Sequence, residues 1–218
     1  MIQEKENELF ERWKQERPEY ASFNEDGVVN PEQWEWTSPK IVFVLRDTNE
    51  LNGDLREFLK GGGDGDTWNN IVRWAEVLLF NKYSTRLDKD YCAKILSSIC
   101  AINLKKESGK GKANLKKIKE AAERDKHFIK EQLDLYQPDI VIACGHDSAP
   151  TASILMNIYE DFDSKWLNFN GLDYYFTNKI NKTKPICVIS MPHPNRAGIE
   201  KWTNLLRDLY SALKSIEE

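Results

Sequence analysis

Three polar residues, Asp47, Asn103 and His193, each lie at or just after the end of an apolar run of the chain. A carboxylate can position or activate a water molecule, an imidazole can exchange a proton, and an amide can make paired hydrogen bonds. In open α/β sheets, ligands bind where the carboxyl ends of the strands meet. The pattern therefore predicts that these three side chains form one site.

The segment 191–196, Met-Pro-His-Pro-Asn-Arg, is the most restricted of these strand ends. It follows the apolar run 186–190 and precedes a helical pattern that starts near Ala197. Because proline fixes its own backbone angle, two prolines make this turn stiff. We expect the turn to hold His193 and Arg196 at the carboxyl end of a strand.

Apolar runs and helical spacing predict the elements that must position these residues. Buried strands are expected over about 40–46, 98–103, 139–144 and 186–191, and helices over 3–17, 68–79, 114–136, 148–160 and 197–215. Residues 18–38 are expected to be loop-like, and 172–177 to form a short strand or hairpin. Strands that alternate with helices predict an α/β fold of three layers around a mostly parallel four-stranded sheet. We expect one domain over 1–218, with 1–38 as a helix-and-loop extension.

The composition is that of a globular protein, with 40% hydrophobic and 30% charged residues among 218. No apolar run approaches the ~20 residues that span a bilayer, and the N-terminus has no signal-peptide core. We therefore expect a cytoplasmic protein, without membrane contact and monomeric. The four cysteines form no C-x-x-C pair, so their spacing does not indicate a metal centre, and Cys100, Cys144 and Cys187 are expected to be buried.

The net charge of −4 hides an uneven distribution. Residues 1–36 carry ten acidic and four basic side chains, whereas residues 105–119 carry seven lysines and one glutamate. A local basic patch matters more for phosphate binding than the total charge does. The alternative is a solvated helix face, which is the common role of a lysine run.

Four short segments form an ordered set of motifs. They are Leu-Arg-Asp-Thr-Asn at 45–49, Thr-Trp-Asn-Asn-Ile at 67–71, Ala-Ile-Asn-Leu-Lys-Lys at 101–106 and His-Pro-Asn-Arg at 193–196. Together they resemble the motifs of the uracil-DNA glycosylase superfamily. Their order, with the strand pattern of 137–145 between the third and the fourth, is similar to that of the family. The resemblance implies a uracil-DNA glycosylase-like fold and an enzyme that hydrolyses the N-glycosidic bond of a base in DNA.

The resemblance also implies a role for each matching residue. Asp47 would direct water and offset the cationic sugar, and His193 would support the leaving base. Asn103 would read the base edge, while Trp68 or Phe58 would form an aromatic wall for the flipped base. The substrate-binding residues expected on this basis are Asn103, Trp68, Asn49, Phe58 and Arg46. No metal or organic cofactor is needed for this chemistry.

DNA is the expected partner, single- or double-stranded, because the lysine run begins two residues after Asn103. The residues expected to hold the DNA backbone are Lys105, Lys106, Lys110, Lys112, Asn195 and Arg196. Four of the expected site residues could instead have a purely structural role. Asp47 could cap a turn, and Asn103 could satisfy backbone groups. His193 could be structural, and Trp68 could belong to the core.

The chain departs from the family pattern at three positions. Leu45 replaces a glycine and Thr48 replaces a proline, which changes the loop that would hold water. Asn49 stands where members strict for uracil have a tyrosine that crowds the 5-position of the base. The smaller asparagine leads to the hypothesis of a 5-modified pyrimidine substrate, excised in repair or in antiviral defence.

Three other function classes stay open. The first is a non-catalytic protein that binds DNA or a modified nucleotide on the same fold. The second is a small-molecule enzyme that uses the glycine-rich loop 61–65, although that loop lacks the Gly-Lys-Ser/Thr ending of a nucleotide-binding loop. The third is a protein-interaction role for the acidic N-terminal segment and its tryptophans.

Overall fold

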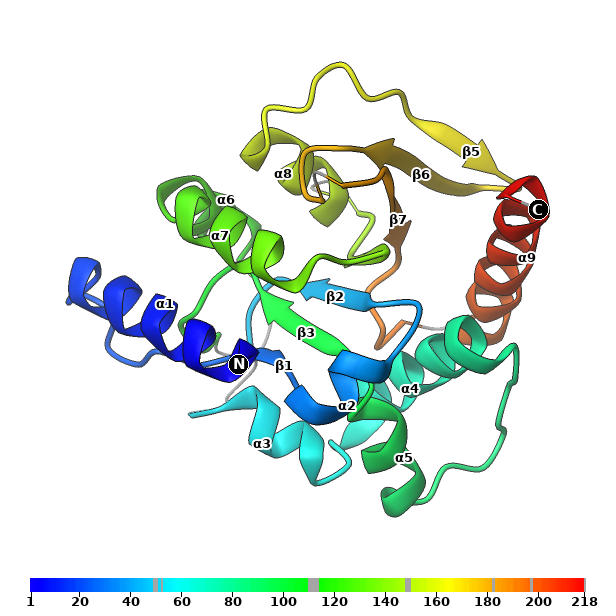
Figure 1. Ribbon diagram of the computed structural model, residues 1–218, viewed down its shortest axis with the longest axis horizontal. Coiled ribbons are helices and arrows are strands. Elements are labelled where there is room, and N and C mark those ends of the chain that lie inside the picture. The colour runs from blue at the N-terminus through cyan, green and yellow to red at the C-terminus, as the bar shows by residue number, and fades with distance from the viewer. Residues whose placement is uncertain are drawn as a thin grey trace.

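In the computed structural model, helices alternate with strands along the chain. The strands form one mixed sheet, and helices cover both of its faces (Figure 1). It describes residues 1–48, 51, 53–109, 114–147, 150–181, 183–196 and 198–217. The strands are β1 (Gly27–Val28), β2 (Ile41–Leu45), β3 (Cys100–Asn103), β4 (Ile140–Cys144), β5 (Leu167–Phe169), β6 (Leu172–Thr177) and β7 (Ile186–Met191). The helices are α1 (Ile2–Glu16), α2 (Pro31–Trp36), α3 (Leu55–Lys60), α4 (Gly65–Phe80), α5 (Lys89–Leu96), α6 (Leu115–Arg124), α7 (Lys126–Tyr136), α8 (Thr151–Ile158) and α9 (Ile199–Glu217).

The sheet order is β1-β3-β2-β4-β7-β6-β5. Its four inner strands, β3, β2, β4 and β7, are parallel, and they are the four strands expected from the apolar runs. The α/β class is therefore confirmed. The expected size of the sheet is wrong, because in the described part of the chain β1 and the β5–β6 hairpin extend it to seven strands with antiparallel edges.

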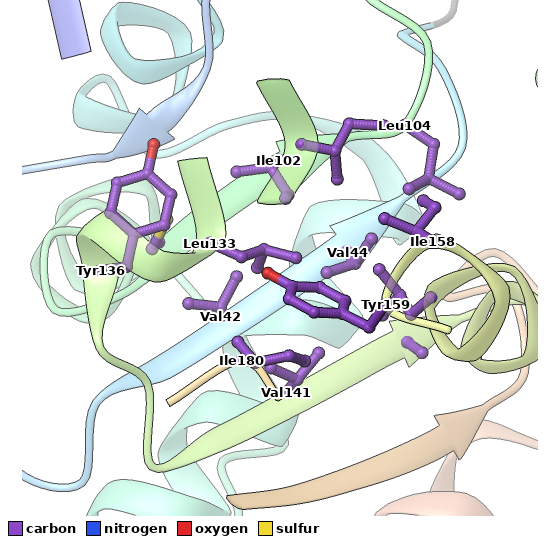
Figure 2. Close-up of a cluster of buried hydrophobic side chains, with 14 of the residues drawn as sticks. Val42, Val44, Ile102, Leu104, Leu133, Tyr136, Val141, Ile158, Tyr159 and Ile180 are labelled. Atoms are coloured by element: carbon purple, nitrogen blue, oxygen red, sulfur yellow. The ribbon is translucent and has the colours of Figure 1, made fainter. Parts of the chain in front are cut away.

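Each inner strand is buried on both faces, which explains its continuous apolar sequence. Alternate residues enter two separate cores. Val42, Val44 and Val141 pack under α1, α6, α7 and α8 (Figure 2), while Phe43 and Ile142 pack under α3, α4, α5 and α9. The two cores place helices on both sides of the sheet.

The long helix expected over 114–136 is in fact two helices, and Asp125 lies between α6 and α7. Its carboxylate is fully buried and accepts a hydrogen bond of 2.6 Å from Arg17 Nε, just after α1. Asp125 also accepts from the hydroxyl of Tyr20. The break in the helix therefore serves to fasten the N-terminal segment, a tertiary contact that helical periodicity does not reveal.

Residues 18–38, expected to be loop-like, contain two short elements, β1 and α2. The side chain of Asn30 caps α2 by accepting from the backbone N–H of Gln33, and Pro31 occupies the first helical position. All four cysteines are free and buried, in agreement with the expectation for Cys100, Cys144 and Cys187. Within the described ranges, no helix is both long enough and apolar enough to span a bilayer.

Candidate functional site

The parallel register brings the ends of β2 and β3 side by side. Leu45 pairs with Asn103, and the pairing continues beyond the strands, where Leu104 and Lys105 donate backbone hydrogen bonds to the carbonyls of Leu45 and Arg46. Asp47 consequently lies near Lys105. We call the group Arg46, Asp47, Asp147 and His193 the carboxyl edge, because each member follows the carboxyl end of a parallel strand.

Asp47 is half-buried at this edge, and it lies against the backbone of Gly109. A Cβ atom added to Gly109 would approach Asp47 Oδ2 to 2.6 Å, so only glycine fits there without displacement. Burial raises the pKa of the Asp47 carboxyl above its usual 3.8, while the charges of Lys105 and Arg46 counteract the rise. A carboxylate with a raised pKa is a better proton acceptor than an ordinary aspartate.

His193 is half-buried in the turn after β7. Its Nδ1 accepts a hydrogen bond of 3.2 Å from the backbone N–H of Asn195. Burial lowers the pKa of His193, and the positive charges of Arg46 and Arg196 lower it further. The neutral ring therefore carries its proton on Nε2, which leaves an N–H donor on the side away from the backbone.

A buried ion pair joins the ends of β2 and β4. Arg46, 6% exposed, donates to both carboxylate oxygens of Asp147, at 2.9 and 2.6 Å, and to the carbonyl of Gly145. Gly145 has φ +111°, and a Cβ there would lie 2.7 Å from Arg46 Cζ. The bidentate geometry fixes the guanidinium in place, so this ion pair holds the ends of β2 and β4 together. We call it the Arg46–Asp147 bracket.

The His193 turn is also attached to α4. Asn70, 6% exposed, donates a hydrogen bond of 2.7 Å to the carbonyl of Pro194, and its own carbonyl accepts from Arg73 at 2.8 Å. Asn70 belongs to the segment that resembles the family, but the sequence assigned it no role. The contact spans 124 residues of sequence, so periodicity alone could not find it.

The two aromatic residues expected to stack on a base lie together at this end of the molecule. Trp68, in the first turn of α4, meets the ring of Phe58 on α3 with a centroid distance of 6.3 Å in an edge-to-face arrangement. Both side chains are partly buried and pack against the core under α3, α4 and α5.

Asn103 is 2% exposed, and its environment is not that of an open pocket. The buried carboxylate of Asp26 accepts from its backbone N–H at 2.7 Å and from its amide at 3.5 Å. The side chain therefore already has a partner, which is a carboxylate and not the backbone groups of the alternative considered for it. A role in reading a base would require this contact to open.

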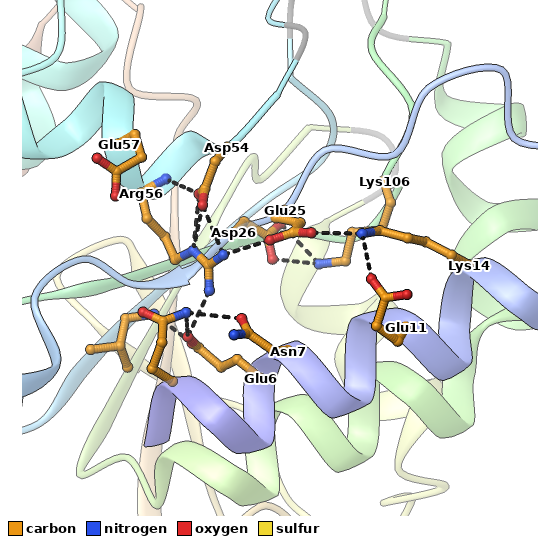
Figure 3. A network of polar contacts seen from close by, with 12 residues as sticks. Glu6, Asn7, Glu11, Lys14, Glu25, Asp26, Asp54, Arg56, Glu57 and Lys106 are labelled. Atoms are coloured by element: carbon orange, nitrogen blue, oxygen red, sulfur yellow. Dashed lines mark hydrogen bonds and ion pairs between the residues drawn. The ribbon is translucent and has the colours of Figure 1, made fainter. Parts of the chain in front are cut away.

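The two adjacent lysines have different environments. Lys106 is fully buried, where its ammonium group donates to Asp26 at 2.7 and 2.8 Å and to Gln132 at 2.9 Å (Figure 3). The expectation that Lys106 contacts DNA is therefore wrong for this structure, because a buried and paired ammonium cannot reach a phosphate. Lys105 is only 9% exposed and donates to the carbonyl of Glu107 at 2.8 Å, so it acts on Asp47 rather than on an open surface.

The ion pair of Lys106 belongs to a larger cluster, which we call the α1 network. Its members are Glu6, Asp26, Arg56, Lys106 and Gln132. Arg56 donates to Glu6 at 2.8 Å, and Glu6 also accepts from the backbone N–H of Val28 at 2.9 Å. Burial raises the pKa of Glu6 even though Arg56 counteracts it. Through Glu6, the network attaches α1 to β1 and α3, and Figure 3 shows the contact between Glu6 and Arg56.

The other lysines of the run that the structure describes are exposed. Lys116, Lys117 and Lys119 lie on the outer face of α6, and Asn195 and Arg196 are exposed after the His193 turn. Arg196 NH2 lies 3.8 Å from Asp147 Oδ2. The expected site residues Asn49, Lys110 and Lys112 lie outside the described residues.

A cavity that the sequence did not indicate opens beside the carboxyl edge, with a volume of about 390 Å³. It is lined by His146, Pro150, Ser153, Trp166, Gly171, Asp173 and Ser190. Nothing in the sequence around His146 distinguishes it from an ordinary loop residue. Among the residues that the structure describes, no group of three or more His, Cys, Asp or Glu side chains is arranged to hold a metal ion.

Comparison with known proteins adds no assignment. A scan against protein-family models gives no match, and a search of curated proteins also finds none. The function is therefore argued from the chain's own residues.

Proposed function

We propose that the protein is a monofunctional DNA glycosylase, which flips a uracil or a 5-modified pyrimidine out of DNA and hydrolyses its N-glycosidic bond. The observation that carries this proposal is the pair formed by Asp47 and His193. They come from the ends of two parallel strands of one sheet, and the pKa of each is shifted towards its neutral form.

The pair suits the charges that develop when a glycosidic bond breaks. Positive charge builds on the sugar and negative charge on the departing base. Asp47 would accept a proton from water and offset the cationic sugar, and its raised pKa favours that role. His193 is held as a neutral ring whose Nε2–H can donate to a base oxygen, because its Nδ1 already accepts from Asn195.

Three features support the geometry of such a site. The Arg46–Asp147 bracket and the hydrogen bond from Asn70 to Pro194 fix the edge before substrate binds. Preorganised groups of this kind need no rearrangement in the transition state. Trp68 and Phe58 lie at the start of α4 and on α3, and α4 is the helix that carries Asn70. They remain the proposed wall for the flipped base.

DNA contact is proposed for the exposed cations. Arg196 keeps its place in this set, and Lys116, Lys117 and Lys119 replace Lys106, because Lys106 is buried. Replacing phosphate-contacting lysines should weaken binding and flatten its dependence on salt. The preference for a 5-modified base rests on Asn49 in the sequence alone.

A second candidate function is a DNA or modified-nucleotide binding protein without catalysis. The observation that favours it is the buried contact between Asn103 and Asp26, because it leaves the expected base reader occupied. Under this proposal the protein would bind the same DNA but leave the glycosidic bond intact.

An abasic-site assay with alkaline cleavage separates the two proposals. The substrates are single- and double-stranded DNAs that contain uracil, 5-hydroxymethyluracil, 5-hydroxymethylcytosine or glucosylated cytosine. We expect excision of one of these bases, with a loss of about 10²- to 10⁴-fold in Asp47→Asn and in His193→Ala. Matched controls are Asp208→Asn on α9 and His127→Ala on α7, both exposed, which should excise at the wild-type rate.

Each result has a distinct meaning. Excision that persists in both Asp47→Asn and His193→Ala would show that the assigned site is wrong. Binding of these DNAs without excision of any base would favour the non-catalytic candidate.

A further inference from the structure

The cavity beside the carboxyl edge lies between β7, the start of α8 and the β5–β6 hairpin. Ser190 of β7 and Asp173 of β6 face the same side of the sheet as Val188 and Tyr175, which belong to the core under α8. The strand or hairpin predicted at 172–177 is β6 of this hairpin, and it supplies one wall of the cavity. Its volume of about 390 Å³ is at the lower end of the range of small-molecule sites, and it suits one nucleoside.

The polar groups of the cavity are available to a ligand. Ser190 is 4% exposed, yet its hydroxyl has no hydrogen-bond partner among the described residues. The ring nitrogens of His146 likewise have no hydrogen bond within the described part of the chain, and the ring packs edge-on against Trp202 at 4.9 Å. A hydroxyl that faces a cavity and has no partner in the described protein can hydrogen-bond to a polar ligand there.

The His146 ring can act as donor and acceptor together. Burial lowers the pKa of His146, and the charge of Arg196 lowers it further, so the ring is neutral near pH 7. A donor and an acceptor side by side match the amide-like edge of a nucleobase. The carboxylate of Asp173, which accepts from Asn168 at 2.6 Å, adds an acceptor for amino or imino N–H groups.

Trp166 supplies an aromatic surface at the same cavity. It is 41% exposed, although Tyr175 holds it edge-on at a centroid distance of 5.0 Å. An exposed tryptophan held in a fixed orientation can stack with a base of any identity. Phe162, shortly before Trp166 in sequence, and Phe176 on β6 are also exposed.

Negatively charged side chains lie in and near the cavity, whereas a positively charged side chain lies beside it. Asp173 in the cavity and Asp147 nearby disfavour a phosphate group inside it. Arg196, 54% exposed, lies 3.8 Å from Asp147, and its charge acts on both His146 and His193. Arg196 therefore lies between the cavity and the His193 turn, where it can hold the phosphate that joins two nucleotides.

We propose that this cavity is a second nucleotide site, which takes the base of an unpaired nucleotide next to the target, stacked on Trp166 and hydrogen-bonded to His146, Ser190 and Asp173. The inference rests on the proposed function, because the target base is assigned to the carboxyl edge. A base in this cavity cannot stay paired, so the substrate is single-stranded or locally melted DNA.

The first test uses fluorescence anisotropy with single-stranded oligonucleotides around one target base. In each oligonucleotide, one neighbouring position carries tetrahydrofuran instead of a nucleotide with a base. One such position should weaken binding to the wild type roughly tenfold, as expected for the loss of one base–aromatic stack. Trp166→Ala should bind the intact strand with the same loss and become insensitive to that position. The control Trp36→Ala changes a tryptophan that is 88% exposed on α2, and it should bind as the wild type does.

A second measurement detects the base itself and does not depend on DNA. Titration with thymidine or deoxycytidine should shift the indole N–H resonance of Trp166, identified by its absence in Trp166→Phe. If strands bind but Trp166→Ala keeps its sensitivity to every position, the cavity proposal is overturned even when excision occurs. If the sensitivity is lost in Trp166→Ala and the nucleoside shifts the indole but no base is excised, the proposed function fails and the cavity proposal stands. Absence of both effects overturns the cavity proposal.

Discussion

The α1 network and the carboxyl edge both gather charged side chains from distant parts of the chain, but their groups are in different states. In the α1 network, Lys106 and Asp26 are fully buried, and each has partners within 3 Å (Figure 3). At the carboxyl edge, Asp47 and His193 are half-buried, with pKa values shifted towards their neutral forms. Saturated, buried charges hold elements together, whereas partly exposed groups with altered pKa values can exchange protons with a ligand.

Lys105 and Lys106 connect the two regions. They are neighbours in sequence, yet Lys106 points into the α1 network and Lys105 acts on Asp47. A lysine run in a sequence can thus divide between a structural ion pair and a site cation.

The largest effect on stability is expected from removing the ammonium group of Lys106, in comparison with that of Lys105. Lys106→Met should lower the free energy of unfolding by about 3–5 kcal/mol, because it leaves the carboxylate of Asp26 buried without a cation. Lys105→Met is the matched control, and it should cost about 1 kcal/mol, the worth of its hydrogen bond to Glu107. Urea denaturation followed by circular dichroism measures both. Equal losses in the two variants would remove the distinction between the two regions.

A smaller effect is expected from the hydrogen bond that fastens the His193 turn. Asn70→Ala leaves the carbonyl of Pro194 without its donor, which should cost about 1–3 kcal/mol of stability. If Asn70 positions His193, the variant should also lower kcat for excision with little change in KM. Asn69→Ala is the control, because the adjacent Asn69 has no contact with the turn in the described structure. A loss of stability without any change in kcat would make Asn70 purely structural.

The inner strands and most long helices could be predicted from the sequence, because burial on both faces produces continuous apolar runs and amphipathic helices have a clear period. The pair of Asp47 and His193 at one edge followed from parallel strands. The Arg46–Asp147 bracket could not be predicted, since its partners are 101 residues apart and each looks ordinary locally. The cavity could not be predicted for a similar reason. In the sequence, Ser190 belongs to an apolar strand and Asp173 to a solvated hairpin, and neither pattern indicates a binding site.

The smallest and most specific effect concerns pH. Excision needs Asp47 ionised and His193 neutral, so activity should fall as the pH drops through either group. Burial raises the pKa of Asp47 above its usual 3.8, so the acid limb of the rate profile should lie at a higher pH than that of an ordinary aspartate. Lys105→Met removes a positive charge that stabilises the Asp47 carboxylate, so its acid limb should move to higher pH if Asp47 controls it.

The stability profile gives an independent sign for His193. Because its pKa is lower in the folded state, the unfolded chain binds a proton first, and the free energy of unfolding should fall as the pH drops below 6.5. His193→Gln should reduce this slope. The prediction fails if the acid limb of the rate profile does not move in Lys105→Met and the pH slope of stability persists in His193→Gln. The groups of the carboxyl edge would then resemble those of a structural ion pair, which do not exchange protons with a ligand.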